Sequence, residues 1–176
     1  MNESAFKNNL TAIVSFEASL EKLNSCLQAL NTWVPQIIVV LPENNDVEKQ
    51  ITNKFNVSIC FQKASSTKSK WESRLKQNNT PWALLIRSNE IITGQLRQTI
   101  TEKIKTSGGE AKKYLLPLTM VFLKKRFKYP LDWNGSQPSL LVHTSITTND
   151  VNQQKKHETL GGELVRYCED TISECA

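Results

Sequence analysis

The segment Trp82-Ala83-Leu84-Leu85-Ile86-Arg87-Ser88-Asn89-Glu90 is a run of apolar residues that ends in a short polar cluster. The residues before it, Asn79-Thr80-Pro81, are typical of a break between elements. A short, continuous apolar run bounded in this way is typical of a strand that is covered on both faces, as in parallel sheets. The segment therefore predicts a buried strand over 82–86 with a polar loop at its carboxyl end.

Strand-like and helix-like segments alternate through residue 106. Apolar runs predict three further strands, over 10–16, 36–41 and 57–61. Apolar repeats at three- and four-residue steps, with capping and breaking residues, predict helices over 18–33, 46–55, 65–78 and a last segment that ends near 107. Because strands that alternate with helices pair through right-handed crossovers, we expect an α/β fold with a mostly parallel sheet.

Polar residues stand at the carboxyl ends of three of these predicted strands. They lie in Phe16-Glu17, in Leu41-Pro42-Glu43 and in Arg87-Ser88-Asn89-Glu90. In open parallel sheets, ligands bind beyond the carboxyl ends of the strands. We therefore expect these three loops to line any cleft.

The pattern changes after residue 110. Residues 115–127 are apolar and then basic, 129–135 form a turn rich in aromatic rings, and 139–143 are compatible with a strand. The basic part of the chain, from Lys103 to Lys128, holds eight cations and only one acid, Glu110. Two interpretations of 115–127 remain open: a core helix with a basic end, and a peripheral contact with acidic lipid.

Length and composition indicate one domain over 1–176, with 39% hydrophobic and 22% charged residues. No apolar run reaches the roughly 20 residues that a membrane span needs, and 1–9 do not resemble a secretory signal. The four cysteines are scattered and do not predict a zinc site or disulfide framework. We expect a cytoplasmic protein, and the absence of an aromatic-plus-basic signature gives no reason to expect nucleic acid as a partner.

Taken in order, the segments resemble the family 2 glycosyltransferases of the A-type fold, especially the branch that adds sugars to the lipopolysaccharide core. Trp82–Ile92 resembles the family's W-I-L-x-L-D-A-D-E-x-x segment, Gln137–Leu141 its Q-x-R-L-F region, and Leu160–Tyr167 its L-K-G-x-L-x-H-Y closing segment. The resemblance implies a three-layer, nucleotide-diphospho-sugar transferase-like fold with a mostly parallel central sheet. It also implies a donor side over 1–106, and an acceptor side with the closing segment over 107–176.

In enzymes of this family a divalent metal, Mg²⁺ or Mn²⁺, usually offsets the charge of the donor diphosphate and is held by a D-x-D motif. The matching positions here are Arg87, Ser88 and Asn89, and Glu90 is the carboxylate beside them. Arginine cannot ligate a cation, and asparagine offers a neutral carbonyl. We therefore predict a degenerate metal site and name no cofactor.

Other family positions are also altered. The arginine of the Q-x-R region is replaced by Ser139 and the closing histidine by Arg166, whereas His157-Glu158 is interpreted as a surface pair and His143 as structural. The donor-cleft candidates are Glu17, Glu43, Asp46, Lys70, Arg87, Asn89 and Glu90. The acceptor-side candidates are Trp133, Gln137 and Arg166.

Two functions in cell-envelope polysaccharide assembly follow from the resemblance. One is a transferase with weak, metal-independent activity, in which Arg87 and Lys70 neutralise the diphosphate. Its partners would be a nucleotide-sugar donor and a lipid-linked saccharide acceptor at the inner membrane. The other is a catalytically silent binding or scaffolding module. The chain is short for the family, which points to a larger protein or a partner subunit.

Overall fold

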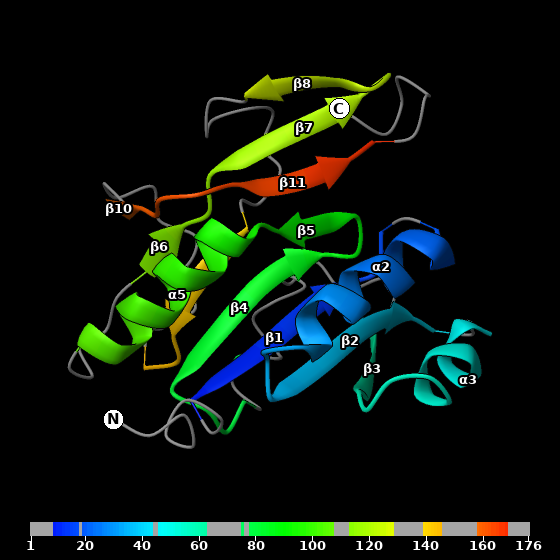
Figure 1. Cartoon of the computed structure of the whole chain (residues 1–176). Coiled ribbons are helices and arrows are strands. Elements are labelled where there is room, and N and C mark those ends of the chain that lie inside the picture. Colours follow the sequence, from blue (N-terminus) through cyan, green and yellow to red (C-terminus); the bar gives the residue numbers. More distant parts are fainter. Residues whose placement is uncertain are drawn as a thin grey trace.

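A computed structural model describes residues 9–17, 19–43, 46–62, 75, 78–107, 113–128, 139–145 and 158–168. Its strands form two sheets (Figure 1). The larger sheet has seven strands in the order β10-β6-β9-β4-β1-β2-β3. Their bounds are β1 Leu10–Ser15, β2 Gln36–Pro42, β3 Ser58–Gln62, β4 Trp82–Arg87, β6 Lys113–Leu115, β9 Leu140–His143 and β10 Glu158–Thr159.

The larger sheet is mostly parallel, as the sequence predicts. Strand β1 pairs in parallel with both β2 and β4, and β2 pairs in parallel with β3. Strand β9 runs antiparallel to its two neighbours, β4 and β6. Four predicted strands are confirmed to within about two residues at each end: those over 10–16, 36–41, 57–61 and 82–86.

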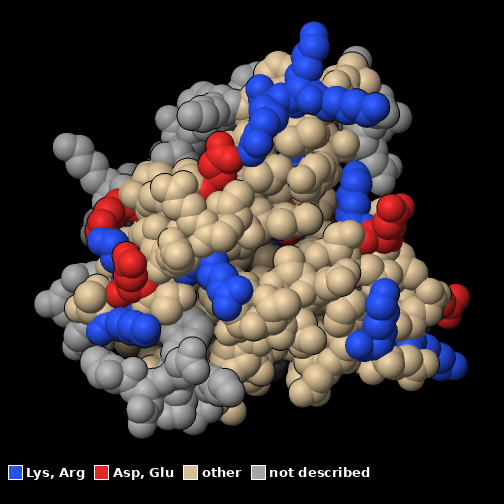
Figure 2. All heavy atoms as spheres, viewed as in Figure 1, with Lys and Arg blue, Asp and Glu red and all other residues tan. Residues whose placement is uncertain are grey.

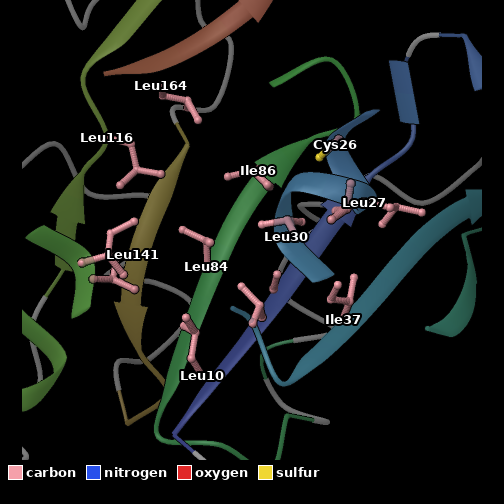
Figure 3. Close-up of a cluster of buried hydrophobic side chains, with 14 of the residues drawn as sticks. Leu10, Cys26, Leu27, Leu30, Ile37, Leu84, Ile86, Leu116, Leu141 and Leu164 are labelled. Atoms are coloured by element: carbon pink, nitrogen blue, oxygen red, sulfur yellow. The ribbon is translucent and has the colours of Figure 1, made fainter. Parts of the chain in front are cut away.

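Three helices cover one face of this sheet: α2 Leu20–Asn31, α3 Val47–Thr52 and α5 Gly94–Thr106. Figure 3 shows Cys26, Leu27 and Leu30 of α2 lying over Leu84 and Ile86 of β4, and all five side chains are buried. Ser19 and Thr93 cap α2 and α5 by accepting hydrogen bonds from backbone N–H groups. The spacing of the leucines along α2 thus places the apolar stripe of this helix against the sheet.

The opposite face of the sheet has its own apolar cluster, which includes Ile13, Val40, Leu85 and Val142. Leu75, which is helical and buried, belongs to this cluster. The rest of the helix predicted over 65–78 lies outside the described residues, apart from Asn78. Leu75 therefore places a helical residue on the face opposite α2, α3 and α5, which agrees with the expected three-layer arrangement.

The short helix α3 differs from its prediction. Asp46 stands at the N-cap position as expected, but its side chain makes no capping hydrogen bond. The helix ends at Thr52 rather than at Phe55. The Asn53 N–H still bonds to the Lys49 carbonyl four residues back, but the Lys54 N–H bonds to the Ile51 carbonyl only three residues back, so the chain tightens into a turn after the helix. Phe55 nevertheless packs into the core.

A second sheet was not predicted. Its four strands have the order β5-β11-β7-β8, with bounds β5 Glu90–Ile92, β11 Leu164–Tyr167, β7 Leu118–Phe122 and β8 Lys125–Lys128. Strands β7 and β8 form an antiparallel hairpin, so the interpretation of 115–127 as a core helix is wrong. The two turn residues, Leu123 and Lys124, have φ angles of 48° and 62°, as tight hairpin turns require.

Gly162 fixes the entry of β11. Its φ is +105°, and a Cβ at this position would lie 2.5 Å from the backbone nitrogen of Leu96 at the start of α5. Only glycine tolerates both the torsion and the close approach. The preceding Gly161 is less constrained, since its Cβ would meet Thr99 Oγ1 at 3.7 Å.

No helix in the described part of the chain is long and apolar enough to cross a membrane.

Candidate functional site at the carboxyl edge of the central sheet

The carboxyl ends of β1 and β4 bring Glu17 and Arg87 together. Ser15 and Arg87 are register partners, so the two strands end side by side. Arg87 Nε lies 2.9 Å from Glu17 Oε2, with side-chain exposures of 11% and 27%. The guanidinium and the carboxylate form an ion pair. The positive charge of Arg87 is therefore offset locally by Glu17.

Two serines hold this edge together. Ser15 Oγ donates to Glu17 Oε1 at 3.1 Å, and the Glu17 N–H donates to Ser88 Oγ at 3.0 Å. The Ser88 N–H in turn donates to the Ser15 carbonyl at 2.9 Å. Sequence reasoning did not select these serines, although both are small polar residues at the ends of apolar strands. They orient the loop after β1 relative to the turn after β4.

Glu90 is fully buried and forms the centre of a second charged cluster. Its Oε2 accepts from the Arg87 backbone N–H at 2.8 Å and from Ser139 Oγ at 2.6 Å. Its Oε1 accepts from Arg166 Nε at 3.1 Å and from Arg166 Nη2 at 2.6 Å. Glu90 and Arg166 are cross-strand partners in β5 and β11. The cluster therefore ties the second sheet to the ends of β4 and β9.

A divalent metal does not fit these residues. The two oxygens of Glu90 together accept four hydrogen bonds, which matches the roughly four lone-pair directions of a carboxylate. Arg87 adds positive charge where the D-x-D motif would place an acid. Within the described ranges, no group of three or more His, Cys, Asp or Glu side chains is placed to hold a metal ion.

The thiol of Cys26 packs against this cluster. Cys26 Sγ donates to the Arg87 carbonyl at 3.8 Å. Burial raises the pKa of the Cys26 thiol well above its usual range, and the negative charge of Glu90 raises it further. A protonated, buried thiol is a poor nucleophile. Cys26 is therefore a packing residue of the core rather than a reactive group.

Asn89 lies in the turn between β4 and β5. Its backbone carbonyl accepts from the Tyr167 N–H at 3.0 Å. Its Oδ1 is buried and has no hydrogen-bond partner among the residues that the structure describes. Because buried polar atoms are almost always paired, this oxygen is an unusual unsatisfied acceptor in the turn.

The remaining candidates do not all join the site. Glu43 and Asp46 are exposed at the end of β2 and the start of α3. Lys70, Trp133 and Gln137 lie outside the described residues. Arg166, expected on the acceptor side, pairs with Glu90. The structure thus brings Glu17 to Arg87 and Arg166 to Glu90, and joins both pairs through the turn at 87–90.

The structure describes His143 and, of the predicted surface pair His157-Glu158, only Glu158. His143 packs edge-on against Trp82, with ring centroids 5.1 Å apart, and its Nδ1 is 2.7 Å from Ser145 Oγ. This environment supports a structural role. Glu158 is exposed and pairs with Lys103 on α5, as a surface residue would, whereas His157 is outside the described residues.

Comparisons with known proteins identify the fold. No family model matches the sequence, and neither does any curated protein. S. aureus TarS 1-349 in complex with UDP-GlcNAc aligns with a TM-score of 0.61 and 13% identity, over 91% of this chain and 58% of TarS. The TarS complex with UDP aligns with a TM-score of 0.60 and 12% identity, over 91% and 60% of the two chains.

A nucleotide-dependent synthetase has a related fold. CMP:2-keto-3-deoxy-manno-octonic acid synthetase complexed with CTP aligns with a TM-score of 0.53 and 6% identity, over 84% of this chain and 79% of that chain. Such low identities define the fold alone. The chain therefore has the A-type, nucleotide-diphospho-sugar transferase-like α/β fold, and it spans less than two thirds of the TarS chain that it matches.

Proposed function

We propose that this chain is a glycosyltransferase-like protein of cell-envelope polysaccharide biosynthesis in which metal-dependent sugar transfer has been lost, so that it serves as a binding or scaffolding module. The observation that carries the proposal is the saturation of Glu90, the carboxylate beside the degenerate motif, by four hydrogen bonds. The ordered resemblance to the lipopolysaccharide-core branch supports the pathway.

Loss of turnover follows from the size of the missing interactions. In a metal-dependent transferase, charge develops on the departing nucleotide and must be stabilised at the site. Here Glu90 could bind a cation only by releasing Arg166, Ser139 or the Arg87 N–H. If each lost electrostatic contact costs about 2.7 to 4 kcal/mol, two or three missing contacts lower the rate by roughly 10⁴ or more.

Binding can persist where catalysis is lost. The site lies at the carboxyl edge of the central sheet. TarS, which has a similar fold, was crystallised with UDP-GlcNAc and with UDP. At this edge Asn89 offers a buried acceptor, and Glu17 is partly exposed. These groups suit the hydroxyl and N–H donors of a nucleoside or sugar better than a metal diphosphate. The proposed ligand is therefore a nucleotide sugar bound without a cation.

The test is a thermal shift experiment with UDP, UDP-GlcNAc and GDP, each with Mn²⁺ and with a chelator. We expect stabilisation by at least one nucleotide that is the same in both conditions, with no transfer of radiolabelled sugar to a saccharide acceptor. A nucleotide-dependent shift that requires Mn²⁺ would overturn the proposal. Mn²⁺ alone is the control for metal binding elsewhere on the chain.

A second candidate is metal-independent transfer, which is favoured by the position of Arg87 at the end of β4. Its partner Glu17 is partly exposed, so a diphosphate can compete with that carboxylate for the guanidinium. Transfer that persists in chelator, disappears in Arg87→Ala and is retained in part by Arg87→Lys would support it. The absence of transfer from every nucleotide sugar tested would exclude it.

A further inference from the structure

The β7–β8 hairpin combines exposed apolar side chains with a local excess of positive charge. Leu123 and Phe127 are 58% and 45% exposed, and Tyr167 on the neighbouring strand β11 is 42% exposed. These are three of the four large apolar side chains that are exposed in the described part of the chain. The register places Phe127 beside Met120 and Tyr167 beside Val121, so these two rings lie on opposite faces of the sheet, and Leu123 at the hairpin tip is the most exposed of the three.

The positive charge of the whole chain is concentrated around this hairpin. Residues 118–128, from β7 to the end of β8, contain four basic residues and no acidic residue, whereas the chain carries a net charge of +5, so the remainder has a net charge of only +1. Lys124, Lys125 and Arg126 are all exposed. Figure 2 shows lysine and arginine side chains gathered at the top of the view, over the hairpin. Glu163 pairs with Arg126 at 2.7 Å.

The turn adds a backbone observation. Leu123 and Lys124 both adopt left-handed φ angles, 48° and 62°, at a position where glycine or asparagine is preferred. Leu123 has a strained backbone and an exposed apolar side chain. A leucine at this position therefore favours neither the stability nor the solubility of the protein. Such outliers point to a functional demand on the side chain. Here the demand is for an apolar group at the tip of a basic hairpin.

We infer that the β7–β8 hairpin docks on an anionic lipid bilayer. Leu123 inserts at the boundary between head groups and acyl chains, while Lys124 and Lys125 face the lipid phosphates. A nucleic acid would use the same cations but has no use for an aliphatic tip. The cations also protect β8, an edge strand, from pairing with other chains, but that role gives no reason for an exposed leucine.

The test is flotation of the full chain with vesicles. One set is made of phosphatidylcholine alone, and the other of phosphatidylcholine mixed with phosphatidylglycerol. We expect binding to the mixed vesicles only, weakened by salt. Lys124→Gln/Lys125→Gln should bind roughly 25-fold more weakly, at roughly fivefold for each cation removed. Arg126 is left intact because it pairs with Glu163.

Two further variants separate a specific hairpin contact from general charge. Lys49→Gln/Lys105→Gln removes the same charge from exposed positions on α3 and α5, and should bind as the unmodified chain does. Leu123→Gly keeps every charge and relieves the strained φ, so it should fold with an unchanged or higher Tm yet bind roughly tenfold more weakly.

Three results would overturn the inference. They are equal binding to both vesicle types, equal losses in the hairpin and control double variants, and unchanged vesicle binding in Leu123→Gly. Binding of inorganic polyphosphate or RNA that exceeds vesicle binding and ignores Leu123 would assign the surface to a free polyanion instead. Because flotation requires neither a nucleotide nor sugar transfer, its failure is distinguishable from failure of the proposed function.

Discussion

Two acid–arginine pairs lie at the same edge of this molecule and differ mainly in burial. Glu90 is 0% exposed and binds Arg166, whereas the Glu17 side chain is 27% exposed and pairs with Arg87. The first pair has every carboxylate lone pair occupied, while the second touches solvent. The same kind of ion pair is therefore closed off from solvent in one place and partly open to it in the other.

The physical reason is the cost of burying charge. Removing a carboxylate and a guanidinium from water costs several kcal/mol for each ion, which is recovered only when hydrogen bonds satisfy both groups. Ser139 and the Arg87 N–H supply those bonds to Glu90. A partly exposed pair is screened by water and contributes little to stability, so its partners can change at low cost.

The largest expected effect comes from Glu90→Gln. One oxygen becomes an NH₂ group, which cannot accept from the donors that now bind that oxygen, and Arg166 loses its counter-charge. We expect the free energy of unfolding to fall by about 3 to 5 kcal/mol in urea titrations. The control, Glu43→Gln, changes an exposed carboxylate and should stay within about 0.5 kcal/mol.

A compensating double variant sharpens this test. Glu90→Leu/Arg166→Met replaces the pair by apolar side chains and should recover a large part of the loss, because no buried charge is left uncompensated. A Glu90→Gln variant as stable as the unmodified chain would remove the distinction between the two acid–arginine pairs.

The next largest effect is expected for Gly162→Ala, which tests how β11 brings Arg166 to Glu90. The new Cβ would lie 2.5 Å from Leu96 N, at a φ of +105°. Backbone strain and overpacking together should cost about 2 to 4 kcal/mol. The matched variant Gly161→Ala meets Thr99 Oγ1 at an ordinary 3.7 Å and should be nearly neutral. Equal Tm values for the two variants would contradict the role of Gly162.

The sequence predicts the exposed half of this comparison better than the buried half. Continuous apolar runs predict the two strands that end close to Glu17 and at Arg87. Parallel pairing of these strands then places the two side chains at the same edge of the sheet. The bonds from Arg166 and Ser139 to Glu90 span 76 and 49 residues. No local pattern encodes such contacts, and the resemblance identified both positions only as departures from a motif.

The missed second sheet has the same cause. Strand β5 has only three residues, Glu90–Ile92, and is stabilised by β11 far along the chain. The β7–β8 turn at Leu123-Lys124 lacks the Asn-Gly or Asp-Gly signal that predicts a tight hairpin. Tertiary pairing therefore decides these elements, whereas α2 and α5 follow from their leucine and isoleucine spacing.

A smaller effect is expected from alkaline pH, through Cys26 beside the buried pair. Burial raises the pKa of this thiol above its ordinary value of 9.0 in the unfolded chain. Above pH 9 the unfolded state loses the proton while the folded state keeps it, so stability falls as pH rises. The contribution of this group is at most about 1.4 kcal/mol between pH 9 and pH 10.

The check is to compare Tm against pH for the unmodified chain and for Cys26→Ala. The variant has a lower Tm throughout because it loses packing, but its decline between pH 9 and pH 10 should be shallower. A maleimide reagent should label the partly exposed Cys60 before unfolding and Cys26 only after it. Rapid labelling of Cys26 in the folded chain would mean that the Glu90 cluster opens readily.

The smallest change in stability is expected for Glu17→Gln, yet this variant separates the two pairs most sharply by function. The amide keeps an acceptor near Arg87 and removes one negative charge, so unfolding should change by about 1 kcal/mol or less. If the exposed pair exchanges with a ligand, removing the competing carboxylate should tighten UDP binding in chelator, by roughly fivefold for about 1 kcal/mol of repulsion. If Glu17 instead serves as a metal ligand, UDP binding should weaken, and only when Mn²⁺ is present.

Titration calorimetry of the unmodified chain, Glu17→Gln and Glu43→Gln distinguishes these results, since Glu43 carries the same charge at an exposed position after β2. Tighter binding in Glu17→Gln therefore means that Arg87 binds the ligand in place of a cation, weaker binding with Mn²⁺ means that Glu17 holds a metal, and unchanged binding means that the pair only closes the edge of the sheet.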